Sequence, residues 1–180
     1  MTNHFFFLTH NNGKLMNVKC LKVLSLFLLI LSSVSNLSHA TDRRGRLGVG
    51  LNNQLKNDLP SISFKLQKSK SFAFGGLLGL STDDSNGGFG AGLKVYRNLF
   101  DEPQLNFYTA LMGALLKEKS AGVEQSGFQV DLTLGSEFHF AGLTSLGFSF
   151  EFGVSFNKLD DFVAETTGSH FVVAGIHFYL

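Results

Sequence analysis

Apolar and polar residues alternate along eight segments of the chain, most regularly in SLGFSFEFGVSF at residues 145–156. Leu, Phe and Val occupy its even positions, whereas Ser, Gly and Glu occupy its odd positions. A period of two predicts a β-strand with one apolar and one polar face. No helical period follows Arg46, so we expect an all-β chain. The predicted strands span residues 46–51, 61–67, 71–80, 88–96, 105–116, 128–140, 145–156 and 170–180.

The connections between these strands alternate in length. Residues 52–60, 81–88, 117–127 and 157–168 are polar and mostly long, whereas the intervening connections are short or intermediate. In an antiparallel order, this alternation places the long loops at one end. Short periplasmic turns and longer external loops are typical of bacterial outer-membrane barrels. The sequence therefore predicts an eight-stranded antiparallel up-and-down transmembrane β-barrel, with these four loops facing outward.

The polar faces of the predicted strands are rich in Gly and Ser and carry few long charged side chains. A sheet face exposed to water usually carries more charge, whereas small residues suit the narrow lumen of an eight-stranded barrel. Charges in such a lumen need partners, because burying an unpaired charge is costly. We expect Glu151 to point inward and to pair with Lys65 or Lys94. The predicted lumen charge network consists of Lys65, Lys94, Asp131, Glu137 and Glu151.

The apolar faces are broad and rich in Phe and Leu, which suits a band that faces lipid. In water, the same faces would favour aggregation unless they were covered. The alternative is a periplasmic β-sandwich or a lipocalin-like barrel, in which the Phe residues pack inward. That alternative predicts a more charged opposite face than this sequence has.

Composition adds little to this interpretation. The chain of 180 residues contains 20 Phe and 20 Gly but no Trp, and its formal net charge is +1. The balanced charge gives no electrostatic reason to expect a nucleic-acid partner.

The N-terminal region has the pattern of a secretory signal peptide. A short basic region begins at Met16, an apolar run covers residues 23–31, and small residues precede a cleavage site after Ala40. The apolar run is too short for a bilayer-spanning helix. We therefore predict an over-extended start at 1–15, a signal peptide at 16–40 and a barrel at 41–180. Cleavage would remove Cys20, the only cysteine, and leave a mildly acidic mature chain.

The chain ends on VVAGIHFYL, which resembles the C-terminal insertion signal of bacterial outer-membrane proteins. That signal usually ends on Phe or Trp, whereas this chain ends on Leu180. The predicted signal residues are Val172, Ala174, Ile176, Phe178, Tyr179 and Leu180. The whole mature chain is similar to small eight-stranded barrels of the outer-membrane protein A transmembrane-domain type. The resemblance implies a Gram-negative outer membrane, with membrane lipids and the barrel-assembly machinery as partners, and we expect a monomer.

The motifs that suggest chemistry are weak. GGFGAG at 87–92 has Leu93 where a phosphate-binding loop would have its third Gly. His139 and His170 are expected near opposite ends of the barrel, so they cannot share a metal ion. Ser169 and His170 are adjacent on a predicted strand and point to opposite faces, so His170 is not a ready base for Ser169, although Asp161 and Glu165 lie nearby. We therefore expect no catalytic residue, cofactor or metal.

The sequence leaves three functions open. We favour a structural or surface-interaction role, with a lumen closed by charged and small residues. The first alternative is a narrow channel or transporter of small or hydrophobic solutes. The second is an outer-membrane lipid-modifying enzyme.

Overall fold

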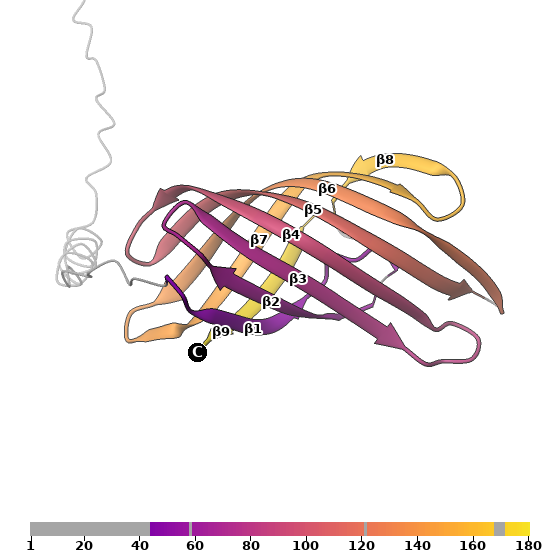
Figure 1. Cartoon of the computed structure of the whole chain (residues 1–180), viewed down its shortest axis with the longest axis horizontal. Helices are drawn as coiled ribbons and strands as arrows, with labels where there is room; N and C mark the ends of the chain where they lie inside the picture. The colour runs from indigo at the N-terminus through magenta and orange to yellow at the C-terminus, as the bar shows by residue number, and fades with distance from the viewer. Residues whose placement is uncertain (1–43, 58, 121, 168–171) are drawn as a thin grey trace, which may run out of the picture. The chain divides into compact units, whose positions relative to one another are not determined.

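The computed structural model describes residues 44–57, 59–120, 122–167 and 172–180 (Figure 1). The predicted start region and signal peptide lie outside these residues. Within them, no helix is long and apolar enough to cross a membrane. The strands are β1 (Leu47–Asn52), β2 (Ser61–Gln67), β3 (Phe72–Ser81), β4 (Gly88–Asp101), β5 (Leu105–Ser120), β6 (Val123–Phe140), β7 (Leu143–Lys158), β8 (Phe162–Thr166) and β9 (Val173–Tyr179).

Eight of these strands form a closed antiparallel barrel. From β1 to β7, each strand pairs with the next one along the chain, and β9 pairs with both β7 and β1. The last backbone contact joins the chain end to the first strand, because the Leu180 N–H donates to the Leu47 carbonyl over 2.9 Å. The predicted all-β, eight-stranded antiparallel barrel is confirmed.

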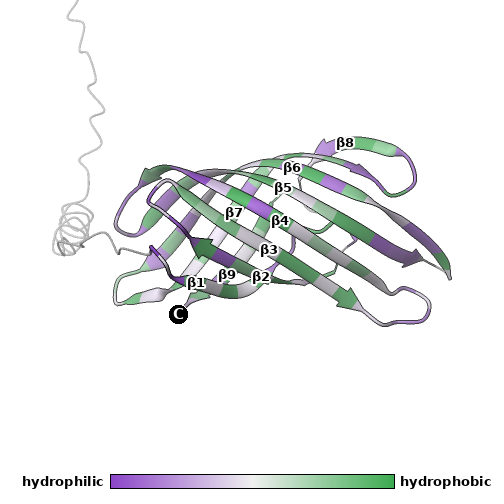
Figure 2. Ribbon diagram, in the orientation of Figure 1, coloured by the Kyte–Doolittle hydropathy of each residue, from purple (hydrophilic) through white to green (hydrophobic). Residues whose placement is uncertain are grey.

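Side chains alternate between the two surfaces of the wall. On β7, Phe150 and Phe152 are about half exposed on the outside, whereas Glu151 between them is 2% exposed and points into the lumen. Figure 2 shows this alternation as apolar and polar bands along each ribbon. On β3, which is apolar on both faces in the sequence, Phe74 and Leu78 point outward and Leu77 points inward.

The connection predicted at 117–127 is mostly strand. β5 continues to Ser120 and β6 starts at Val123, so the two strands form a long hairpin. Gly122 in its turn has a φ of +84°, a conformation that other residues rarely adopt. The prediction of a loop was wrong because the hairpin extension has no apolar face. The alternation of apolar and polar residues therefore did not reveal that the strands continue there.

The predicted loop at 157–168 also contains a strand, β8, which pairs with the C-terminal end of β7. β8 and β9 both lie antiparallel along the same edge of β7, with Thr166 opposite Val154 and Val173 opposite Glu151. They are two parts of one interrupted strand. The predicted eighth strand at 170–180 therefore starts later, at Val173, and residues 168–171 lie outside the described part.

The connection between β1 and β2 does not face outward as predicted. Gln54 and Leu55 are at most 1% exposed, and Asn57 is also buried. The main chain turns inward after β1, and these side chains enter the half of the lumen next to the C-terminal end of β1, which is called the outer half below. The physical reason is that the lumen offers this polar segment both hydrogen-bond partners and an apolar surface, which sequence periodicity alone does not reveal.

Candidate functional site in the barrel lumen

An ion pair between β4 and β7 lies in the lumen. Lys94 Nζ is 2.6 Å from Glu151 Oε2, and both side chains are at most 2% exposed. Glu151 also accepts hydrogen bonds from Tyr108 over 3.0 Å and from Thr133 over 2.8 Å. The strand alternation places all four side chains on the inner face, and closure of the barrel brings them together.

A second ion pair joins β2 to β6. Lys65 Nζ is 2.5 Å from Glu137 Oε2, and these side chains are also buried. The hydroxyl of Tyr179 on β9 donates to Glu137, and His139 Nε2 lies 3.7 Å from the same carboxylate. Lys65 therefore pairs with Glu137, and Lys94 is the partner of Glu151.

Two tyrosines lie between the ion pairs. Tyr96 and Tyr108 meet edge to face, with ring centroids 5.3 Å apart. Lys65 Nζ lies 4.7 Å from the Tyr96 centroid and 4.8 Å from the Tyr108 centroid. Lys94 Nζ lies 5.1 Å from the Tyr96 centroid. The rings therefore offer both lysines cation–π contacts in addition to their carboxylates.

Asp131, the fifth residue of the predicted network, is buried on β6 and has amide partners. Its Oδ2 accepts hydrogen bonds from Gln54 Nε2 and Gln129 Nε2, each over 2.8 Å. Gln54 Oε1 in turn accepts from Lys94 Nζ over 2.5 Å. Gln54 thus connects Asp131 to the first ion pair.

Sequence reasoning missed several members of this network. Tyr96 and Gln129 lie on the polar faces of their strands, so their inward direction was available from the alternation. Tyr108 lies on β5, where both faces carry apolar residues, so the alternation did not decide its direction. No such signal existed for Gln54, because it lies between strands.

The described histidines, His139 and His177, and the chain end lie in the barrel wall. His177 Nε2 is 2.9 Å from the Ser63 hydroxyl inside the lumen. His170 and Ser169 lie outside the described residues. Tyr179 points inward, whereas the other predicted insertion-signal residues point outward: Val172, Ala174, Ile176, Phe178 and Leu180.

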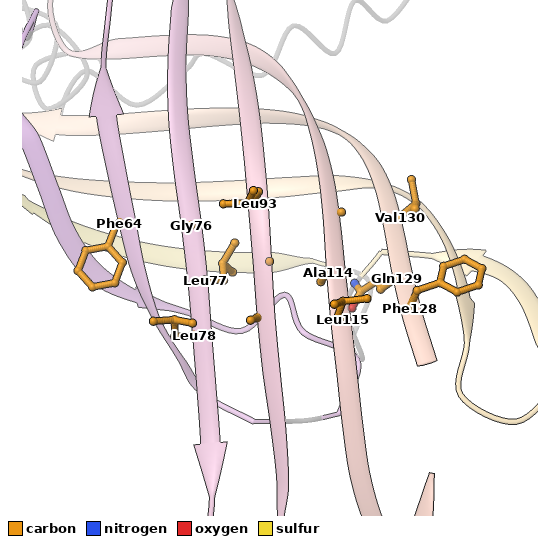
Figure 3. A pocket seen from close by; sticks show the side chains of 13 residues that line it. Phe64, Gly76, Leu77, Leu78, Leu93, Ala114, Leu115, Phe128, Gln129 and Val130 are labelled. Atoms are coloured by element: carbon orange, nitrogen blue, oxygen red, sulfur yellow. The ribbon is translucent and has the colours of Figure 1, made fainter. Parts of the chain in front are cut away.

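The outer surface of the wall carries a shallow apolar groove of ≈ 550 Å³ across β2 to β6 (Figure 3). Its floor is formed by small residues, Gly76, Ala91 and Gly113, and leucines and phenylalanines flank it. Leu93 in its middle is 77% exposed. The groove belongs to the apolar outer wall and contains no convergent polar groups.

At one end of the barrel, β8 is connected to the segment between β1 and β2. Lys56 Nζ lies 3.0 Å from Glu165 Oε2, and Asn157 Nδ2 donates to Glu165 Oε1 over 2.6 Å. Partial burial opposes ionisation of Glu165, but the hydrogen bonds from Asn157 and Lys56 outweigh it and lower the pKa of this carboxyl.

Comparison with known proteins supports the architecture. No family model matches the chain, and no curated protein matches it. Among solved structures, the chain is similar to the crystal structure of the N-terminal β-barrel domain of OprF from Pseudomonas aeruginosa. The TM-score is 0.59 at 12% sequence identity, and the match covers 76% of this chain and 98% of that domain. At this identity, the similarity shows a shared fold, the closed eight-stranded antiparallel β-barrel.

Proposed function

We propose that this chain is an integral protein of a Gram-negative outer membrane, with a structural or surface-interaction role. The observation that carries the proposal is the distribution of side chains across the wall. Large apolar residues cover the outside, whereas two ion pairs and many polar groups lie within. This is the reverse of a protein that folds around an apolar core in water.

The outer wall is suited to acyl chains. All eight barrel strands carry half-exposed Leu, Phe, Ile or Val side chains on their outer face. A continuous apolar surface of this kind would favour aggregation in water. A bilayer removes that cost, and a closed barrel leaves no unpaired strand edge in the hydrocarbon. Membrane lipids and the barrel-assembly machinery are therefore its proposed partners.

The lumen supports a sealed barrel more than a transporter. The charged side chains at its centre are paired, and Tyr96 and Tyr108 fill the space between them. A pore would need unoccupied space along the axis, which eight strands seldom provide. The OprF barrel carries the same fold. The Ser63 hydroxyl lies 2.9 Å from His177 Nε2 in the described lumen, but both side chains are at most 2% exposed, and no described acid orients His177, because its Nδ1 has no hydrogen-bond partner. We therefore propose a closed, non-enzymatic barrel that acts as a monomer.

Fractionation of cells that express the full chain tests this proposal. The protein should remain with outer membranes after a carbonate wash, and its gel mobility should change on heating. Recovery in the soluble periplasmic fraction would contradict membrane insertion. Planar-bilayer recordings then test the seal, because a closed barrel inserts without conductance steps and a channel gives steps of reproducible size.

A further inference from the structure

The segment between β1 and β2 fills the outer half of the lumen in the way a bound ligand would. Its residues Asn53–Asn57, called the lid segment below, belong to no strand, and three of their side chains are buried. A loop that only connected two strands could stay in water, where its polar groups need no protein partners. The burial of this segment therefore reflects specific partners in the lumen.

The side-chain amide of Gln54 forms hydrogen bonds with two groups of opposite charge. Its Nε2 donates to Asp131 Oδ2 over 2.8 Å, and its Oε1 accepts from Lys94 Nζ over 2.5 Å. A carboxamide satisfies both groups, because it has a donor and an acceptor on one planar unit. A carboxylate in the same place would face Asp131 as a like charge.

The side chain of Gln129 forms hydrogen bonds with the main chain of the lid segment. Gln129 Nε2 donates to the carbonyl of Gln54 over 3.1 Å, and Gln129 Oε1 accepts from the N–H of Lys56 over 3.0 Å. One side-chain amide thus pairs with a carbonyl and an N–H that are two residues apart. This arrangement recognises peptide groups independently of side-chain identity.

The side chain of Leu55 occupies an apolar recess. It packs in a buried cluster on Leu77 of β3 and on Met112, Ala114 and Leu116 of β5. This apolar patch contrasts with the rest of the lumen, where charges and tyrosines predominate. A small aliphatic group is the occupant that it fits.

We propose that the outer half of the lumen is a peptide-binding pocket that the lid segment occupies and covers. Its ligand would be a short peptide, or another amide, that presents a carboxamide next to an aliphatic group. The lid segment would compete with that ligand for the same partners. The proposal depends on the lumen geometry and not on the cellular location proposed above, so the two can fail separately.

The test uses a thiol in the pocket of the refolded full chain in detergent. Leu116→Cys places the thiol among the buried residues, and Cys20→Ser leaves it as the only one. Gln54→Gly with Leu55→Gly empties the pocket. We expect a charged, water-soluble maleimide to label this thiol at least about tenfold faster in the emptied background than with the native lid segment. Lys68→Ala, at the opposite end of the barrel, is the matched control and should leave labelling slow.

The peptide Asn-Gln-Leu-Lys-Asn, with blocked ends, is the probe. At about 1 mM it should slow labelling of the emptied background saturably. A control peptide with Glu in place of Gln and Ser in place of Leu should not. Equal labelling rates with and without the native lid segment would contradict the proposal that this segment covers the pocket. Absence of protection, or equal protection by both peptides, would overturn the peptide site.

A milder variant keeps the test decisive if the double glycine variant fails to show the heat-dependent gel shift of a folded barrel. Gln54→Glu retains Leu55 but places a carboxylate against Asp131. Labelling should again accelerate, by a smaller factor. Unchanged labelling in a folded Gln54→Glu chain would contradict the role of Gln54 in holding the lid.

Discussion

At the scale of single residues, Glu151 connects more of the lumen than any other residue described above. It pairs with Lys94 and accepts hydrogen bonds from Tyr108 and Thr133, so four strands depend on one carboxylate. Removing one partner of a buried ion pair is costly because the other charge stays buried without compensation. The pair therefore fixes how these strands sit around the lumen.

Glu151→Gln tests this dependence, because the amide keeps the size of the side chain but removes its charge and replaces one acceptor oxygen with an NH2 donor. We expect a loss of about 3–5 kcal/mol in the free energy of unfolding, measured by urea titration in lipid vesicles. The double variant Lys94→Met with Glu151→Gln should recover most of this loss. Purely additive effects of the two changes would show that the pair is not coupled.

Gly135 provides a second test at this scale. A Cβ at this position would lie 2.7 Å from the Tyr108 ring and 2.7 Å from Cγ of Glu151. We expect Gly135→Ala to cost about 1–3 kcal/mol in the same urea titration, because the tyrosine must shift. Gly113→Ala is the matched control on the outer face, where a Cβ meets nothing within 4 Å. Equal effects of the two substitutions would refute the tight packing over Gly135.

The sequence predicted which way residues such as Glu151 and Lys94 point, because strand alternation decides it. It could not choose between Lys65 and Lys94 as the partner of Glu151. Both lysines lie on inner faces. Which of them reaches Glu151 depends on the stagger of the strands around the closed barrel, and the alternation within single strands does not give that stagger. The structure assigns Lys94 to Glu151 and Lys65 to Glu137.

At the scale of elements, the β5–β6 hairpin extends well beyond the apolar part of its strands. Lys117 Nζ lies 2.7 Å from Glu124 Oε2 near its tip, with both side chains about half exposed. A polar hairpin of this kind is stable because the ladder satisfies its backbone groups and cross-strand pairs add small contributions. Recognition from sequence failed here because an exposed strand needs no apolar face.

The tip of this hairpin should respond to pH. The hydrogen bond from Lys117 and the charges of Lys117 and Lys119 lower the pKa of Glu124. A carboxyl whose pKa is lower in the folded state stabilises above its unfolded pKa of about 4.3 and loses that contribution as the pH falls below it. The protection factors of the amides near Ser126, which already correct for chemical exchange, should therefore fall as the pH drops below about 4.3. Glu124→Gln should abolish this pH effect, and an unchanged pH profile in that variant would assign it elsewhere.

The β1–β2 connection shows a second limit of sequence reasoning. Its composition is that of a surface loop, yet Gln54 is fully buried. The preference for the lumen comes from partners on β4 and β6 that are distant in sequence. Such a placement becomes visible only when the barrel is assembled.

At the scale of the whole molecule, the proposed function requires that the outer surface of the wall meets lipid. The sequence predicted eight strands and their closure because seven other segments of the chain repeat the alternation of residues 145–156. The closed antiparallel barrel confirms that part. The composition of the chain offers a direct way to measure contact of the outer wall with a bilayer.

The chain contains no Trp, and its three tyrosines, Tyr96, Tyr108 and Tyr179, all point into the lumen with at most 3% of their surface exposed. Phe152→Trp would add one tryptophan to the outer wall, where Phe152 is 54% exposed. In vesicles of lipids brominated along their acyl chains, we expect strong quenching of this tryptophan. Tyrosine emission of the unsubstituted chain should be nearly unaffected. Quenched tyrosines together with an unquenched tryptophan would place the polar face against lipid and contradict the account.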